Sequence, residues 1–124
     1  MDQRFDDNEK LYRAVYPPST AALFWKKDGK VSSAAFADKK GLSVDRGDFR
    51  SDSEVTADIT KRLSGRIISV TAGQCRDVRA KVCYLPSKTN PYHSEIRGSE
   101  TELLLSITQR KHLALCAEYV YTQD

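Results

Sequence analysis

The chain has 124 residues, with 20 lysines and arginines, 17 aspartates and glutamates, and a formal net charge of +3. This length suits one domain, and a hydrophobic fraction of 40% is typical of a globular protein and excludes a disordered chain. Because acidic and basic residues alternate along most of the sequence, the charge permits nucleic-acid binding, but no basic run indicates it.

No window approaches the roughly 18 consecutive apolar residues of a membrane span, and the N-terminus lacks the apolar core of a secretory signal. We therefore expect a cytoplasmic protein without membrane contact. Its cysteines, Cys75, Cys83 and Cys116, form an odd set without the close pairs that organise disulfide frameworks or zinc sites. They predict buried, reduced thiols, no metal and no cofactor.

Residues 1–10 are polar and are expected to be flexible, with a single α+β domain over residues 11–124. After two consecutive prolines, three short strands are predicted, over residues 21–26, 31–36 and 42–45. Asp28-Gly29 is a strong turn signal between the first two strands. The pattern predicts a three-stranded antiparallel meander.

A helix is predicted over residues 52–64. Ser51 and Glu54 have the spacing of a capping box, and Gly65 follows where a left-handed cap ends a helix. Its apolar residues recur at helical intervals and would form the buried face: Val55, Ile59 and Leu63.

Further strands are predicted over residues 66–73, 80–86 and 92–97. A second capping box at Ser99 and Glu102 predicts a long C-terminal helix. One face of that helix would carry Leu103, Ile107, Ala114, Ala117 and Tyr121. The predicted class is α+β, a small antiparallel sheet of about five or six strands packed by two helices.

The run from Ser32 to Phe49 is unusually polar for core strands. Ser43 and Asp45 are two residues apart in an extended segment, so their side chains would share one face. A polar ligand could bind there, and the candidate binding residues of this run are Ser32, Ser33, Ser43, Asp45 and Arg46. The alternative is that the small residues lie beneath a helix, while Asp45 and Arg46 form a surface ion pair.

A second polar run, Asn90 to Gly98, holds the candidate catalytic residues His93 and Glu95. In a strand the two side chains would share a face, and a carboxylate beside an imidazole can orient the ring and raise its basicity for general-base catalysis. The alternative is that His93 fixes its loop by bonding a backbone carbonyl.

The order LYRAVYPP, SSAAF, GLSVDR, NPYHSEIRG and a final helix resembles a group of small prokaryotic proteins without a defined activity. In that group an SSAAF-like, a GLSV-like and an NPxHxEI-like run follow in this order. The resemblance covers most of the chain from Leu11 and implies a microbial cytosolic protein. A fainter likeness, to small ADP-ribosyl transferases, would place Arg13 and Ser32 or Ser33 against a dinucleotide.

Two functions follow as hypotheses. The first is a non-catalytic accessory protein of a prokaryotic multi-protein system, which binds a protein partner through a polar sheet edge. The second is a small hydrolase or a nucleotidyl or ADP-ribosyl transferase, with His93 as general base and Glu95, Asp45 and Arg46 as orienting or substrate-binding groups. An enzyme requires His93 to lie within reach of the first polar run in a concave pocket.

Overall fold

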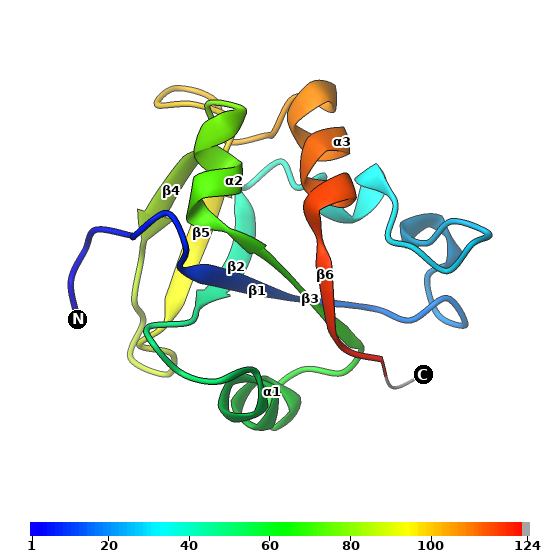
Figure 1. Ribbon diagram of the computed structural model, residues 1–124, viewed down its shortest axis with the longest axis horizontal. Coiled ribbons are helices and arrows are strands. Elements are labelled where there is room, and N and C mark those ends of the chain that lie inside the picture. Colours follow the sequence, from blue (N-terminus) through cyan, green and yellow to red (C-terminus); the bar gives the residue numbers. More distant parts are fainter. Residues whose placement is uncertain (123–124) are drawn as a thin grey trace.

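A computed structural model describes residues 1–122 as one antiparallel sheet with helices on both faces (Figure 1). The sheet has six strands in the order β4-β5-β2-β1-β3-β6. The strands are β1 (Lys10–Val15), β2 (Leu42–Arg46), β3 (Arg66–Thr71), β4 (Lys81–Tyr84), β5 (His93–Arg97) and β6 (Glu118–Tyr121). The helices are α1 (Asp52–Thr60), α2 (Ala72–Asp77) and α3 (Ile107–Cys116), with two short 3₁₀ helices, η1 (Ala22–Phe24) and η2 (Ser33–Phe36). The predicted α+β class is confirmed.

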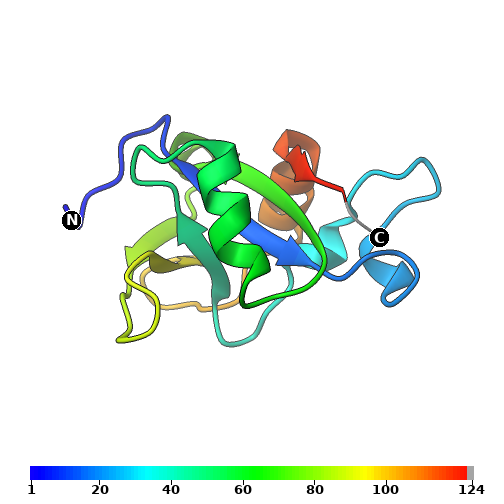
Figure 2. The ribbon, with the colours of Figure 1, turned by 90° about the horizontal axis from the view of Figure 1, so that it is seen from below.

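The two faces of the sheet carry cores of different size. On one face α2, α3 and η2 cover the main core, which runs from Leu11 of β1 to Leu113 of α3. On the other face α1 lies over β1, β3 and β6, where Val55 and Ile59 pack on Tyr12 and Ile67. Figure 2 shows α1 in front of the sheet, with β2 and the loop joining β4 to β5 beside it. Part of this second face is therefore left without a helix.

Helix α1 begins as predicted and ends earlier. The capping box is complete, because the Ser51 hydroxyl accepts from the Glu54 amide and the Glu54 carboxylate accepts from the Ser51 amide, both at 3.1 Å. The helix ends at Thr60 rather than at residue 64, and Leu63 is 53% exposed. The chain turns here to reach Gly65, whose φ of +120° is unfavourable for residues with a β-carbon.

The predicted meander is wrong for two of its three strands. Residues 22–24 and 33–36 are 3₁₀ helices, and a single bridge joins Trp25 to Val31 across the Asp28-Gly29 turn. Alanine and serine are weak strand formers, so this segment has little preference for an extended backbone. It forms η2 instead, which buries Ala35 and Phe36 in the main core.

The predicted long C-terminal helix is also wrong in its bounds. Ser99 and Glu102 form a turn, and the cap of α3 is the Ser106–Gln109 pair. After Cys116 the chain becomes extended, so Tyr121 belongs to β6. The buried side of this segment consists of Leu105, Gln109 and Leu113. The central residue of this buried side is a glutamine, so the spacing of apolar residues does not predict it. Gln109 can be buried because its side-chain amide donates to the carbonyls of Val78 and Gly98.

Residues 1–10, expected to be flexible, contact the domain along their length. Phe5 is buried, and the carbonyls of Asp2 and Arg4 accept hydrogen bonds from the Arg46 guanidinium. Lys10 is already part of β1.

We predict that Ile59→Ala lowers the free energy of unfolding by about 2–4 kcal/mol, because it leaves a cavity between α1 and the sheet. Leu63→Ala should cost less than about 1 kcal/mol, since Leu63 is largely exposed. Urea denaturation of the two variants measures the difference. Equal losses would contradict the observed end of α1.

Candidate functional site

Strands β1 and β2 are hydrogen-bonded at one end and separate toward the other. The paired residues are Leu11 with Arg46 and Tyr12 with Asp45, and beyond them Gly47 donates to the Lys10 carbonyl at 2.8 Å. In a continuing ladder Ala14 and Ser43 would form the next hydrogen-bonded pair, but they do not pair. A cavity of about 240 Å³ lies at this opening. Its lining residues are Tyr12, Arg13, Ala14, Ser43, Val44, Asp45, Ile59, Arg62, Leu63, Asn90 and His93.

Four of the predicted site residues lie together beside this opening. Ser43 is directly opposite Glu95, and Asp45 is directly opposite His93, across the β2–β5 pair. Because these are non-hydrogen-bonded pairs of the ladder, their side chains are close. They lie on the face that carries α1, in the part that α1 leaves uncovered.

Asp45 is held in place by two neighbouring loops. Its carboxylate accepts from Arg62 at 2.6 Å and from the Asn90 amide at 2.8 Å. Asp45 is buried, so these two bonds compensate for the water that the carboxylate loses on folding. The predicted surface ion pair of Asp45 with Arg46 is absent from residues 1–122.

His93 and Glu95 share a face, as predicted, but they are not bonded to one another. The Glu95 carboxylate accepts from Arg97 at 3.0 Å. Within residues 1–122 the His93 ring makes no hydrogen bond, either to a carboxylate or to a backbone carbonyl. Asn90 fixes the loop instead, since its side-chain oxygen accepts from the Tyr92 amide at 3.1 Å. No carboxylate orients the imidazole. The ring nitrogens of His93 at the opening therefore have no hydrogen-bond partner in residues 1–122.

Arg13 lines the opening from the other face of the sheet, the face that carries Leu11 and Val15. Its Nε donates to the Ala35 carbonyl at 3.0 Å and its Nη1 donates to the Ser43 carbonyl at 2.9 Å. These bonds use two of the five N–H groups of the guanidinium, and no carboxylate in residues 1–122 forms an ion pair with it. Burial lowers the pKa of Arg13. A signal for this residue is present in the sequence: an arginine alternates with Leu11 and Val15 in an otherwise apolar strand.

Arg46, predicted as an exposed binding residue, is 2% exposed and lies on the opposite face of the sheet. It forms a bidentate ion pair with Glu9, with both N–O distances 2.8 Å. Its guanidinium carbon lies 4.1 Å from the ring centre of Phe5 and 4.9 Å from that of Tyr84. Hydrogen bonding to Glu9 raises the pKa of Arg46. The residue is therefore structural.

Ser32 and Ser33 do not line the opening. The Ser32 hydroxyl donates to the Leu23 carbonyl at 2.7 Å and so ties η2 to η1. Ser33 faces a separate hollow beside α3, which is lined by Lys26, Ser33, Lys111, Ala114 and Leu115. Of the five candidate binding residues, Ser43 and Asp45 are thus the two that lie opposite the candidate residues of the second polar run.

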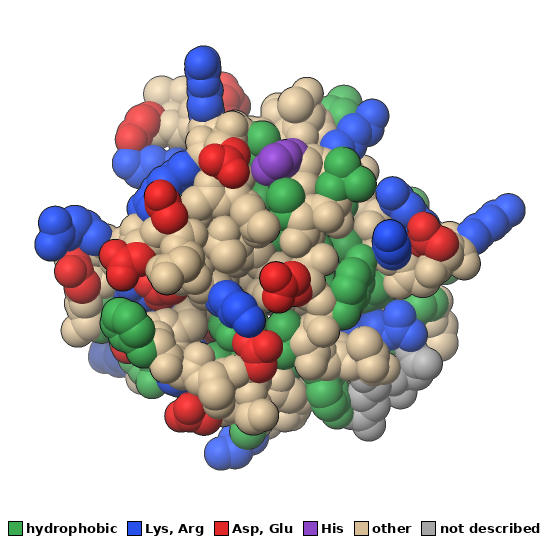
Figure 3. Space-filling model, viewed as in Figure 1, with side chains coloured by type: hydrophobic (Ala, Val, Ile, Leu, Met, Phe, Trp, Pro, Cys, Tyr) green, Lys and Arg blue, Asp and Glu red, His purple; other side chains and the backbone are tan. Residues whose placement is uncertain are grey.

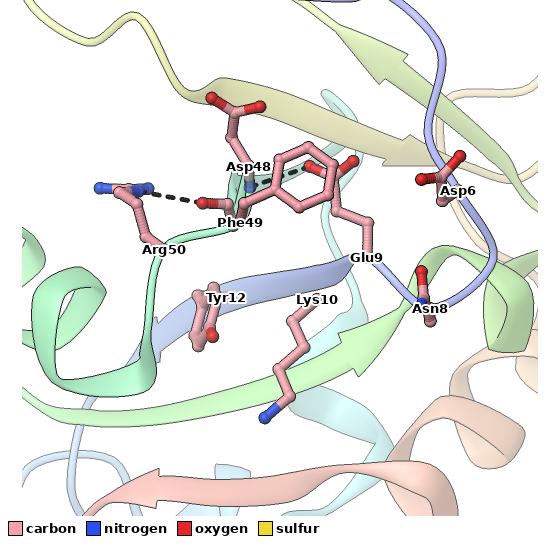
Figure 4. Close-up of a pocket in the computed structure, with 9 residues that line it drawn as sticks. Asp6, Asn8, Glu9, Lys10, Tyr12, Asp48, Phe49 and Arg50 are labelled. Atoms are coloured by element: carbon pink, nitrogen blue, oxygen red, sulfur yellow. Dashed lines mark hydrogen bonds between the residues drawn. The ribbon is translucent and has the colours of Figure 1, made fainter.

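A second cavity, of about 230 Å³, lies beside the start of β1 and the loop after β2 (Figure 4). Glu9, Lys10 and Tyr12 line it from the β1 side, and Asp48 and Arg50 from the loop. Asp52 closes this region by accepting from the Tyr12 hydroxyl at 2.5 Å and from Lys10 at 3.2 Å. The bond from Tyr12 lowers the pKa of Asp52. Glu9, Lys10 and Tyr12 are thus satisfied within the chain, whereas the Asp48 carboxylate has no ion-pair partner in residues 1–122.

Within residues 1–122 no group of three or more His, Cys, Asp and Glu side chains is placed to hold a metal ion. No helix in the described part of the chain has the length and apolar character needed to cross a membrane. No protein-family model, curated protein or solved structure matches the chain.

We predict that Arg46→Ala lowers the free energy of unfolding by about 3–5 kcal/mol, because it leaves the Glu9 carboxylate without its partner. The double variant Arg46→Met/Glu9→Gln should lose less than the sum of the two single variants, since no unpaired charge remains. Arg4→Ala is the control, because that side chain is exposed. Urea denaturation measures Arg46→Ala, the double variant, Arg46→Met and Glu9→Gln singly, and Arg4→Ala, and a cost of Arg46→Ala as small as that of the control would contradict the structural role.

The three thiols should differ in reactivity. Cys75 is fully buried, and burial raises its pKa to about 12, whereas Cys83 and Cys116 are half-buried. Because the thiolate is the reactive form, iodoacetamide at a pH of about 8 should alkylate Cys83 and Cys116 before Cys75. Cys75 should react at a comparable rate only after unfolding. Mass spectrometry of tryptic peptides gives the order, and early labelling of Cys75 would contradict it.

Proposed function

We propose that the protein is a non-catalytic partner-binding protein, and that its binding surface is the opening between β1 and β2 with the adjoining polar face of β2 and β5. The observation that carries the proposal is that the opening is lined, from both faces of the sheet, by polar atoms that have no partner in residues 1–122. Arg13 keeps unused N–H donors, the His93 ring is unbonded, and the backbone of Ala14 has no partner across the opening. Polar groups in a half-buried site gain most from a partner that satisfies them.

The charges of the opening favour an acidic, extended segment of a partner protein. Arg62 already pairs with Asp45, so Arg13, which has no ion-pair partner in residues 1–122, leaves an excess of positive charge at the opening. The unpaired backbone beside Ala14 and Ser43 can bond an extended chain as a neighbouring strand would. A guanidinium with free donors binds carboxylates well because its donors match their geometry.

The size of the cavity supports a binding role over the alternative, a hydrolase or a nucleotidyl or ADP-ribosyl transferase. At about 240 Å³ it is smaller than the roughly 300–1,000 Å³ typical of small-molecule sites. One acidic side chain or a chain end fits such a space better than a dinucleotide. General-base catalysis by His93 also lacks an orienting carboxylate, since Glu95 bonds Arg97 and Asp45 bonds Arg62.

We further propose that the protein acts in the prokaryotic cytoplasm as part of a multi-protein system. This part of the proposal is supported by the resemblance of the SSAAF, GLSVDR and NPYHSEIRG runs to a group of small prokaryotic proteins. Nucleic acid is the weaker partner class, because the lining of the opening is mixed in charge.

The experiment isolates the partner from an extract of the source organism and measures its affinity for purified variants. His93→Ala and Ser43→Trp should each weaken binding by about tenfold or more, the first by removing a donor and the second by filling the opening. Both variants should keep the melting temperature of the wild type, because His93 is unbonded and Ser43 is exposed. His112→Ala is the matched control, since it removes the other histidine, on α3. Wild-type affinity in both site variants would overturn the proposal.

A further inference from the structure

The loop between β2 and α1 presents a phenylalanine to solvent on an unfavourable backbone. Asp48 has a φ of +50° and Phe49 a φ of +65°. Residues with a β-carbon rarely adopt this region, and two in succession, one of them bulky, are exceptional. Phe49 is nevertheless 96% exposed. Neither solvation nor backbone preference explains this arrangement.

The loop is held in this conformation from both sides (Figure 4). The Asp48 amide donates to the Glu9 carboxylate at 3.1 Å. Arg50 donates to the carbonyls of Gly47, at 3.1 Å, and Arg46, at 2.8 Å, and its guanidinium lies 3.4 Å from the ring centre of Tyr92. The exposure of Phe49 is therefore imposed by the surrounding structure. Strain that neighbouring residues maintain in this way is characteristic of functional sites.

Lys10 and Arg50, which line the cavity beside this ring, pair with Asp52 and Asp58, so the charges left unpaired near the ring are acidic. Asp48 precedes it, and Asp6 lines the same cavity. Within residues 1–122 neither carboxylate has an ion-pair partner. An exposed aromatic residue with an acidic rim fits an apolar hollow with a basic rim, because aromatic anchors bind in pockets and the charges at the rim add complementarity.

Such a hollow exists on this same chain. It has a volume of about 240 Å³, with Ala114 and Leu115 of α3 as its apolar part and Lys26 and Lys111 as its charged part. Leu115 is 81% exposed, and neither lysine has an ion-pair partner in residues 1–122. Figure 3 shows basic side chains on both sides of the molecule, and several lie at the right, the side on which Figure 1 places the 3₁₀ helices. The β2–α1 loop lies at the opposite lower left of Figure 1.

We propose that Phe49 of one copy binds the hollow beside Leu115 of a second copy, so that the protein associates head to tail. The ring enters between Leu115 and Ala114, while Asp48 and Asp6 face Lys26 and Lys111. Because the two contact surfaces lie at different places, a pair of copies keeps one free Phe49, on one copy, and one free hollow, on the other. The interface is heterologous and produces open chains or rings rather than a closed pair. It uses surfaces separate from the opening between β1 and β2.

Sedimentation velocity tests this with the full chain at protein concentrations from about 10 μM to 1 mM. The sedimentation coefficient of the wild type should rise with concentration, and less steeply in about 0.5 M salt because of screening. Phe49→Gly and Leu115→Asp should each remain monomeric. The first folds without strain because glycine accepts a positive φ, and the second changes an exposed position. Leu103→Asp, also at an exposed leucine, is the control and should associate like the wild type.

Mixing the two monomeric variants is the decisive measurement. Phe49→Gly keeps the hollow and Leu115→Asp keeps the projecting ring, so an equimolar mixture should form a heterodimer and nothing larger. A wild type that stays monomeric throughout would overturn the proposal. So would association that persists in either single variant, as expected for a symmetric dimer, and so would a mixture that remains monomeric while circular dichroism shows both variants folded.

Discussion

The buried ion pair of Arg46 with Glu9 is the interaction on which both surfaces depend. It joins the end of β2 to the residue that precedes β1, and the remaining donors of Arg46 bind the carbonyls of Asp2 and Arg4. A buried guanidinium is costly unless its donors are satisfied, and here four hydrogen bonds and two aromatic rings surround it. The Glu9 carboxylate also accepts from the Asp48 amide, so the same pair fixes the start of the loop that carries Phe49.

This fixed end of the β1–β2 pair contrasts with its open end. Near Arg46 the two strands pair regularly, and beyond Tyr12 they separate. The two arginines differ accordingly: Arg46 has a carboxylate partner, while Arg13 in the opening bonds backbone carbonyls only. Carbonyl dipoles position a guanidinium without neutralising it. Arg13 therefore has no carboxylate bonded to it in residues 1–122, and this difference is the reason why we propose the opening, and not the more buried Arg46, as the binding surface.

The sequence predicted those features that depend on local chemistry. The Ser51–Glu54 cap, the Asp28-Gly29 turn and the shared face of Ser43 and Asp45 follow from spacing alone, and the structure contains each of them. Features that depend on distant contacts were not predictable. The burial of Arg46 requires Glu9, which lies 37 residues away in the sequence. Because Arg46 follows Asp45 directly, the sequence suggested a surface ion pair between these two neighbours instead. The start of α3 was misplaced because a buried glutamine occupies its core-facing side.

The two proposed surfaces differ in chemistry in a way that lets them act together. The opening between β1 and β2 is small and polar, and contacts of that kind bind weakly because each bond formed replaces a bond to water. Phe49 is apolar and lies on a loop whose backbone is fixed by Glu9 and Arg50, and aromatic residues are frequent anchors of stable interfaces. The residues around Phe49 and Leu115 leave Ser43, His93 and Asn90 uncovered, so a head-to-tail assembly presents one opening per copy. A partner with several acidic segments would then bind through many weak sites at once, and the effective concentration of neighbouring openings would raise its affinity without any new contact within a single copy.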